Sequence, residues 1–119
     1  QKEKGGQWVK GKSGDTFGPL GPYLVTKDEI KDINNLNLSL DVNGSRHQTG
    51  NTNQMIFNFN FLVAHISNFI TLMPGDIVTT GTPPGVGLGM KPPLFLKNND
   101  IMELMVDKLG KQLSKVTKE

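Results

Sequence analysis

The stretch LNLSLDVNG, residues 36–44, decides the fold. Its three leucines and Val42 stand at every second position, so they share one face of an extended strand. Asn43-Gly44 follows directly, and these two residues tolerate the positive φ angles that a two-residue type I′ turn requires. The stretch therefore predicts a β-hairpin whose first strand has one apolar face.

Beyond the hairpin, apolar residues recur at spacings of three and four, the period of a helix with one buried face. The pattern predicts a helix over residues 58–72, ended by Pro74-Gly75-Asp76 and built on Leu62, Ile66, Phe69, Ile70 and Met73. His65 falls on this apolar stripe, so we expect a hydrogen-bonded core histidine rather than a metal ligand. His47 follows the hairpin turn and is expected to be exposed, and the two histidines lack the spacing of a metal site.

The other segments are extended or rich in glycine and proline. Residues 76–80, DIVTT, predict a short β-branched strand that runs into the loop GTPPGVGLGMKPP at 81–93. The last third, LFLKNND and IMELMVDKLGKQLSKV at 94–116, alternates like an antiparallel meander, with breaks at Asn98-Asn99 and Gly110. The first 25 residues hold too many glycines and prolines for more than a short strand. The expected fold is mostly β with a single helix (α+β), and long loops carry the function.

Composition excludes several classes of function. The 119 residues suffice for about one domain or a piece of one, and the opening QKEKGG, which starts no regular element, suggests a fragment. A net charge of +2, spread along the chain, makes no case for a nucleic-acid partner. No apolar run of about 18 residues is present, so no membrane partner is expected. The absence of cysteine excludes disulfides and thiolate metal sites.

Residues 6–13, GQWVKGKS, satisfy the G-x-x-x-x-G-K-S pattern of a nucleotide-binding loop. Such a loop needs a strand before it and a helix after it, whose first N–H groups face the phosphates. Only QKEKG precedes Gly6, and GDTFGPLGP after Ser13 cannot start a helix, so ATP or GTP binding is disfavoured. Two interpretations of Lys12 remain. Residue types alone favour a solvated surface lysine, and the alternative is a charge that steadies a developing enolate or carboxylate.

The loop TGTPPGVG at 80–87 follows the expected strand. Successive backbone N–H groups and a threonine hydroxyl at a strand end can form a concave site for a carboxylate or oxyanion. The alternative, which residue types alone favour, is a tight structural turn. The carboxylates of the chain are scattered, and Asp28-Glu29 have the character of turn residues rather than of a catalytic pair.

Three segments together resemble the C-terminal half of the fumarylacetoacetate hydrolase family: GQWVKGKSGDTFGPLGPYLVT at 6–26, NTNQMIF at 51–57 and PGDIVTTGTPPGVGLGMKPP at 74–93. With the hairpin and the final meander the resemblance covers essentially the whole chain, and it is most similar to the fumarylacetoacetate hydrolase domain-containing proteins. It implies a mixed β-roll fold, usually a homodimer, in the cytoplasm or mitochondria, that holds Mg²⁺ or else Mn²⁺ or Ca²⁺. It also implies action on small dicarbonyl or 2-oxoacid substrates by C–C hydrolysis, decarboxylation or tautomerisation.

The resemblance implies roles for individual residues. Lys12 matches the lysine of the family's G-K-S-F motif, which lies beside the metal and contacts the substrate or the catalytic water. Thr82 matches the threonine of T-G-T, which binds a substrate carboxylate or carbonyl together with the backbone at Gly81. Gln1 matches a glutamine that faces the substrate. Gly14 departs from the family, which has an aromatic residue after K-S.

The family's E-x-E pair and its third metal carboxylate would lie before residue 1. The resemblance therefore implies that residues 1–119 are the C-terminal portion of one catalytic domain and contribute no metal ligand. We expect the chain alone to be inactive and the complete protein to be a metal-dependent hydrolase, decarboxylase or tautomerase. The alternative is a truncated, non-catalytic remnant or a dimerisation module without a metal site.

Overall fold

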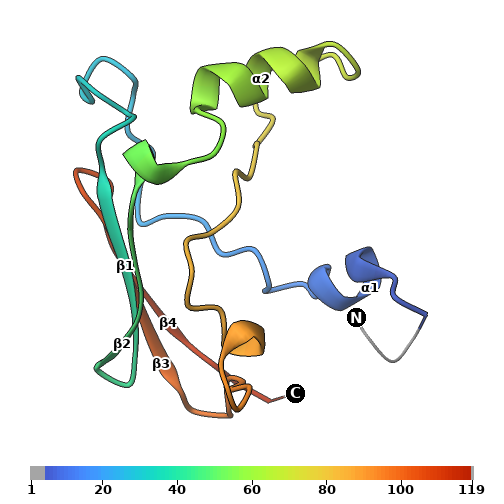
Figure 1. The fold of residues 1–119 in the computed structure, drawn as a ribbon, viewed down its shortest axis with the longest axis vertical. Helices are drawn as coiled ribbons and strands as arrows, with labels where there is room; N and C mark the ends of the chain where they lie inside the picture. The colour runs from blue at the N-terminus through green and yellow to red at the C-terminus, as the bar shows by residue number, and fades with distance from the viewer. Residues whose placement is uncertain (1–4, 119) are drawn as a thin grey trace.

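A four-stranded antiparallel sheet organises the molecule (Figure 1). The computed structural model describes residues 5–118. The strands are β1 (Asn37–Val42), β2 (Ser45–Asn51), β3 (Ile101–Val106) and β4 (Gly110–Lys115), which lie in the order β2-β1-β3-β4. The strand that opens the predicted hairpin is therefore interior to the sheet, where it joins the two hairpins.

The predicted hairpin is confirmed. Asn43 and Gly44 have φ angles of 51° and 78°, both in the left-handed region that a type I′ turn requires. Leu40 pairs with Gln48, and the register of the two strands shifts directly after this pair. Because residues opposite each other in a ladder share a face, Gln48 lies on the apolar face of β1.

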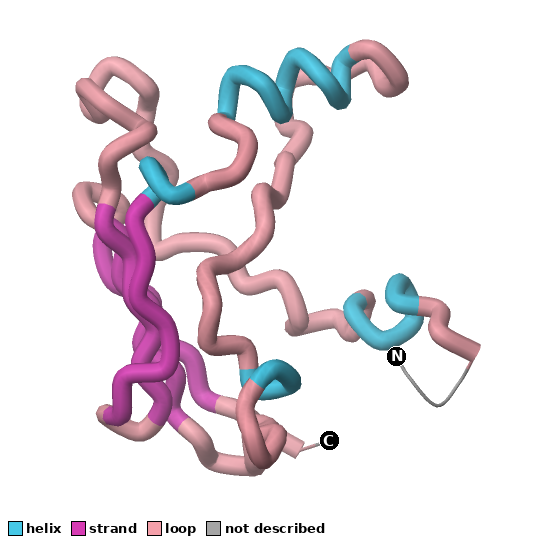
Figure 2. The backbone as a smooth tube through the Cα atoms, viewed as in Figure 1, coloured by secondary structure: helices cyan, strands magenta, loops and turns pink. Residues whose placement is uncertain are grey.

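The core lies on that apolar face. Leu36 and Val42 are buried apolar residues of this face, and Gln48 is a buried polar residue on the same face. Ile30, in the loop before β1, is buried as well. The segment between α2 and β3 runs back along the sheet, as Figures 1 and 2 show. Residues 85–87 and 94–97 of this segment share a pocket with β1 and β2, so the segment covers part of the apolar face.

Two glycines allow this segment to approach β2 closely. A Cβ atom on Gly50 would lie 2.9 Å from the Cβ atom of Pro83. A Cβ atom on Gly85 would collide with the backbone carbonyl oxygen of His47. The backbone of the segment therefore lies directly against β2, closer than it could if Gly50 or Gly85 carried a side chain.

The helix α2 (Phe59–Ser67) ends earlier than the helix predicted over 58–72. Asn58 caps its start, since the side chain accepts a hydrogen bond from the N–H of Phe61 at 2.9 Å. It ends at Asn68 because the Asn- and Phe-rich sequence has low helix propensity and α2 extends away from the sheet, with little packing to hold another turn (Figure 1). No helix between residues 5 and 118 is long and apolar enough to cross a membrane.

A second helix, α1 (Trp8–Lys12), lies in the region where the sequence predicted none, so the prediction of a single helix was wrong. Trp8 and Lys12 are four residues apart and therefore share one helix face. The Lys12 Nζ atom lies 5.2 Å from the centroid of the Trp8 ring, a cation–π contact that supports the short helix despite Gly11 within it. Short 3-10 helices also form at Thr52–Gln54 and Gly87–Gly89.

Two segments that were predicted to be extended strands are not strands. Residues 76–80 and 94–97 have no ladder partner in the described part of the chain. A β-branched composition favours an extended backbone, but a strand also needs a neighbour to take up its hydrogen bonds. The rest of the final meander is confirmed as β3 and β4, and the fold class, mostly β with some helix, is confirmed as well.

The chain exposes more surface than a compact domain of its mass. Its accessible area is 9849 Å², whereas about 6,300 Å² is expected for a compact protein of 13.0 kDa. Its radius of gyration, 15.8 Å, exceeds the roughly 13.5 Å of a compact domain of this length. Among the described residues no large side chain is fully buried. The core is therefore thin, and much apolar surface remains accessible.

Candidate functional site

We call residues 80–85 the Thr82 loop, and residues 80–84 of it border a pocket of about 840 Å³. The sheet, the segment that leads into α2 and the Thr82 loop form its walls. These walls are largely apolar, from Leu36, Leu38, Met55, Phe57, Leu62 and Val106. Gly81 and Thr82 both line the pocket, so the structure brings together two of the residues that the sequence placed in a site.

The hydroxyl of Thr82 is held by a buried side chain from β2. Gln48 Nε2 donates to Thr82 Oγ1 at 2.7 Å and to the carbonyl oxygen of Pro83, also at 2.7 Å. Gln48 is only 9% exposed, so these hydrogen bonds are largely shielded from water. They fix the Thr82 loop to the sheet at the point where the loop meets the pocket.

Gly81 adopts a conformation that favours glycine, with a φ angle of 92°. Nothing lies within 4 Å of the position that a Cβ atom would occupy. The backbone conformation, rather than a lack of space, therefore accounts for glycine here, and the adjoining space is open. Thr82 beside it is exposed as well, so both can be reached by a ligand in the pocket.

Lys12 is the last residue of α1 and is exposed. In a nucleotide-binding loop the lysine precedes a helix, so that the first N–H groups of that helix face the phosphates. Here the helix ends at Lys12, and the backbone groups left free beside it are carbonyl oxygens, which carry partial negative charge. The geometry is therefore the opposite of the one that binds a phosphate.

Phe17 packs against Gly14, the position after K-S where this sequence lacks the expected aromatic residue. The N–H of Phe17 donates to the carbonyl oxygen of Gly14 at 3.0 Å and closes a tight turn. A Cβ atom on Gly14 would lie 2.9 Å from the Phe17 ring. An aromatic side chain therefore lies against position 14 after all, supplied from three residues further along the chain.

The structure does not bring all of the predicted site residues together. Lys12 is absent from the walls of both pockets that are described between residues 5 and 118. Its recorded contact is the one with Trp8. Gln1 lies outside the described residues. The structure thus supports a shared position for Gly81 and Thr82, and the roles of Lys12 and Gln1 stay predictions.

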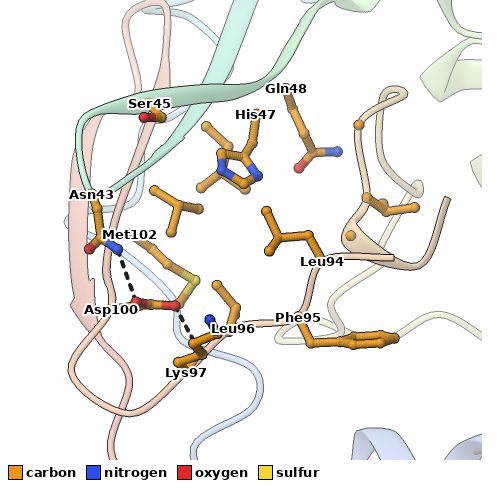
Figure 3. Close-up of a pocket in the computed structure, with 15 residues that line it drawn as sticks. Asn43, Ser45, His47, Gln48, Leu94, Phe95, Leu96, Lys97, Asp100 and Met102 are labelled. Atoms are coloured by element: carbon orange, nitrogen blue, oxygen red, sulfur yellow. Dashed lines mark hydrogen bonds between the residues drawn. The ribbon is translucent and has the colours of Figure 1, made fainter. Parts of the chain in front are cut away.

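A second pocket, of about 440 Å³, lies between the hairpin turn and residues 94–97 (Figure 3). His47 points into it and is half-buried, so the prediction that it is exposed was wrong: the covering segment lies over β2. Asp100 accepts hydrogen bonds from Asn43 Nδ2 at 2.9 Å and from the N–H of Lys97 at 2.7 Å. These bonds, the one from Asn43 first, hold the pKa of Asp100 below its ordinary value. Both carboxylate oxygens accept hydrogen bonds from the surrounding loop and turn, so Asp100 is poorly suited to act as a general acid or base.

The prediction of a hydrogen-bonded core histidine at position 65 was also wrong. His65 is exposed, and its ring lies between those of Phe61 and Phe69, at centroid distances of 6.0 and 5.3 Å. Phe57 extends the row, 4.7 Å from Phe61. The sequence correctly indicated an apolar neighbourhood, but the row of aromatic rings that carries His65 is exposed rather than part of the core.

The residues present do not fit a metal centre by themselves. Between residues 5 and 118 there is no group of three or more His, Asp or Glu side chains placed to hold a metal ion. Divalent cations such as Mg²⁺ and Ca²⁺ require several converging oxygen ligands. Asp28 and Glu29 lie in a turn, as predicted, where the N–H of Glu29 donates to the carbonyl oxygen of Thr26 at 3.1 Å.

Sequence reasoning missed Gln48. The stretch SRHQTGN of β2 carries no apolar alternation, so nothing local distinguishes a buried glutamine from an exposed one. Its position follows from the pairing with Leu40 across the hairpin, which puts the side chain on the covered face. A prediction of strand register, applied to polar as well as apolar positions, is the signal that could have found it.

Comparison with known proteins identifies a family and several relatives of this chain. The family model described as Fumarylacetoacetate (FAA) hydrolase C-terminal matches residues 1–117. The 2,4-didehydro-3-deoxy-L-rhamnonate hydrolase of Sphingomonas sp. (strain SKA58) is 55% identical over 118 residues, which are 98% of this chain and 41% of that protein. The chain thus spans about two fifths of the length of the curated relatives it matches.

Solved structures share the fold. Fumarylacetoacetate hydrolase from psychrophilic Exiguobacterium antarcticum is similar with a TM-score of 0.89 and 36% identity, over 92% of this chain and 39% of that one. Maleylpyruvate hydrolase from Sphingobium sp. SYK-6, in complex with manganese (II) ion and pyruvate, is similar with a TM-score of 0.77 and 35% identity, over 87% of this chain and 36% of that one.

Proposed function

The chain belongs to the fumarylacetoacetate hydrolase family, and we propose that it is part of a divalent-metal-dependent hydrolase, decarboxylase or tautomerase that acts on small dicarbonyl or 2-oxoacid substrates. The observation that carries the proposal is the Thr82 loop, where a fixed hydroxyl borders an open pocket. The maleylpyruvate hydrolase structure, which holds manganese and pyruvate, supports a small oxoacid as the ligand.

Each site residue has a separate task in this proposal. The Thr82 hydroxyl donates to a carboxylate or carbonyl oxygen of the substrate, and the backbone at Gly81 holds the same end of the molecule. The Lys12 ammonium group stabilises the enolate charge that forms when a C–C bond breaks or a proton leaves. Gln1 is assigned a further contact with the substrate. Thr82 therefore acts mainly in binding, and Lys12 acts mainly in the transition state.

We place the metal ligands outside residues 5–118. The scattered carboxylates of this part of the chain do not converge, so the cation, whether Mg²⁺, Mn²⁺ or Ca²⁺, needs carboxylates from elsewhere in the complete protein. The manganese in the maleylpyruvate hydrolase structure supports a divalent ion in this family. The share of the chemistry assigned to residues 1–119 is substrate binding and charge stabilisation.

We also propose that residues 1–119 are the C-terminal portion of one catalytic domain, and that further residues of the same polypeptide complete this domain. Its accessible area exceeds that of a compact protein of equal mass by about 3,500 Å². A standard dimer interface covers only about 800 Å² on each partner. A homodimer, which we propose as well, would therefore leave most of the excess uncovered, and the remaining chain is the better candidate to cover it.

The experiment is turnover of oxaloacetate and of acetylpyruvate by the protein made from its complete coding sequence. We expect turnover with Mn²⁺ or Mg²⁺, loss of turnover in EDTA, and none by residues 1–119 alone. Sedimentation of the same samples reports whether a dimer forms. A well-folded complete protein that dimerises but turns over neither compound with any metal would favour the non-catalytic dimerisation module instead.

A further inference from the structure

We infer that Gln48 is a positioning residue, which fixes the hydroxyl of Thr82 as a hydrogen-bond donor toward the bound substrate. The inference rests on the proposed function, because only that function makes Thr82 a substrate contact. Gln48 lies outside every motif that marks the site in the sequence. Its role follows from the hydrogen bonds that it makes on the covered face of the sheet.

The orientation of the Gln48 amide is set by Pro83. The carbonyl oxygen of Pro83 can only accept a hydrogen bond, so the amide atom 2.7 Å from it must be the nitrogen Nε2. The same Nε2 lies 2.7 Å from Thr82 Oγ1. An amide nitrogen carries two hydrogens, and these two acceptors use both. Thr82 Oγ1 is therefore the acceptor of this hydrogen bond.

The hydrogen of the Thr82 hydroxyl is consequently left for another acceptor. A hydroxyl carries a single hydrogen, and its oxygen is already engaged by Gln48. The other acceptor recorded for it in the described chain is the Pro83 carbonyl at 3.4 Å, a long distance for an O–H donor, and that oxygen already accepts from Gln48. A ligand oxygen in the pocket can offer a better partner.

The Gln48 side chain has little freedom to release this arrangement. It is 9% exposed and opposes Leu40 across the hairpin. The Thr82 loop packs against its stem, since a Cβ atom on Gly85 would lie 3.1 Å from Gln48 Cγ. The amide is therefore held in place before any ligand arrives, which lowers the ordering cost of binding.

This arrangement selects the chemistry of the ligand. A hydroxyl whose oxygen already accepts one hydrogen bond is biased toward donating its hydrogen, so it favours a carboxylate or carbonyl oxygen over an ammonium group. A free threonine hydroxyl can serve either kind of partner by rotating. Gln48 thus gives the pocket a preference for the oxygen end of an oxoacid.

The test uses the complete protein loaded with Mn²⁺, with pyruvate as the probe in calorimetry and acetylpyruvate as the substrate in kinetics. Gln48→Glu replaces both donors by a carboxylate, to which the Thr82 hydroxyl would itself donate. Gln48→Met removes the donors and keeps the length of the side chain. Gln112→Glu is the matched control, because Gln112 lies on β4, at the opposite edge of the sheet from β2, and its side chain donates to the carbonyl oxygen of Gly21 at 3.3 Å.

We expect Gln48→Glu to weaken pyruvate binding and raise the KM for acetylpyruvate about tenfold, with kcat changed less than threefold. Gln48→Met should have a smaller effect of the same kind, which covers the case that Gln48→Glu fails to fold, and Gln112→Glu should have none. In a protein that already carries Thr82→Val, Gln48→Glu should change KM less than twofold. Such coupling is expected only if Gln48 acts through the Thr82 hydroxyl.

The outcomes separate the inference from the proposed function. If Thr82→Val weakens pyruvate binding while folded Gln48 variants do not, the inference is overturned and the proposed function stands. If the Gln48 effect persists undiminished without the Thr82 hydroxyl, Gln48 does not act through it and the inference is likewise overturned. If the parent protein binds no pyruvate, or the Thr82→Val variant binds it equally well, the proposed role of Thr82 is wrong. The inference about Gln48, which depends on that role, is then wrong as well.

Discussion

Gly85→Ala in the complete protein tests how the Thr82 loop is seated on the sheet. Gly85 has a φ angle of 111°, which alanine rarely adopts. The added Cβ atom would also collide with the carbonyl oxygen of His47 and lie 3.1 Å from Gln48 Cγ. Both obstacles belong to β2, so the loop has to lift from the strand to relieve them.

The expected loss of stability combines two terms. Forcing alanine into a left-handed conformation costs about 1–2 kcal/mol. Inserting a methyl group into occupied space costs about 1–3 kcal/mol, and a loop that lifts to avoid this loses hydrogen bonds to Gln48 worth about 1 kcal/mol each instead. We therefore expect Gly85→Ala to lower the free energy of unfolding by roughly 3 kcal/mol.

Urea unfolding of three alanine variants measures the two terms separately. Gly81→Ala carries the unfavourable φ angle of 92° with nothing within 4 Å of its Cβ atom, so it reports conformational strain alone. Gly18→Ala introduces neither an unfavourable φ angle nor a close contact, so this variant should unfold like the parent. Gly85→Ala should be the least stable by a clear margin. If it loses no more stability than Gly81→Ala, the loop does not rest on β2 as described.

Further predictions concern the site and its surroundings. Lys12→Met should lower kcat about a hundredfold in the complete protein while Lys10→Met leaves kcat unchanged, and equal activities would refute the role of Lys12. Thr82→Val should raise KM more than it lowers kcat, and steady-state kinetics on acetylpyruvate decide this. Because hydrogen bonds lower the pKa of Asp100 below its ordinary 3.8, its stabilising effect is present above that value and lost as the pH falls through the lowered pKa. Asp100→Asn should therefore lower the Tm at pH 7, and the difference should shrink as the pH falls below 3.8. Mg-ATP should show no saturable binding in calorimetry.

Local patterns were enough to predict the two hairpins of the sheet, but not the pairing of β1 with β3 that joins them. The hairpin at 36–51 was predictable because alternation and the Asn43-Gly44 turn agree, and both depend only on neighbouring residues. The strand predicted at 76–80 failed because strands depend on a partner, which the described chain does not supply there. The helix α1 was missed because a glycine-rich stretch has a weak helix propensity, and the contact between the Lys12 and Trp8 side chains appears only once the helix is formed.

The candidate site was predictable only where a motif carries it. The T-G-T-P motif pointed to Gly81 and Thr82, and the structure places both at one pocket. His47 and His65 were misplaced because their burial depends on which segment covers β2 and on which way α2 faces, and neither can be read from spacing. Gln48 was missed for the same reason, since a partner across a ladder determines its surroundings.

The two motif residues of the site show how neighbours in space decide chemistry. Lys12 completes a pattern shared with nucleotide-binding loops, yet α1 ends at this residue and leaves carbonyl oxygens beside it, which disfavour a phosphate. Thr82 by itself could donate or accept, yet Gln48 occupies its oxygen and leaves its hydrogen for a ligand. In each case the residue type permits several chemistries, and one adjoining backbone or side-chain group favours some of them over others. An oxoacid that accepts from the Thr82 hydroxyl also carries the negative charge that the Lys12 ammonium group is proposed to stabilise, so the two proposed roles are consistent with a single substrate class.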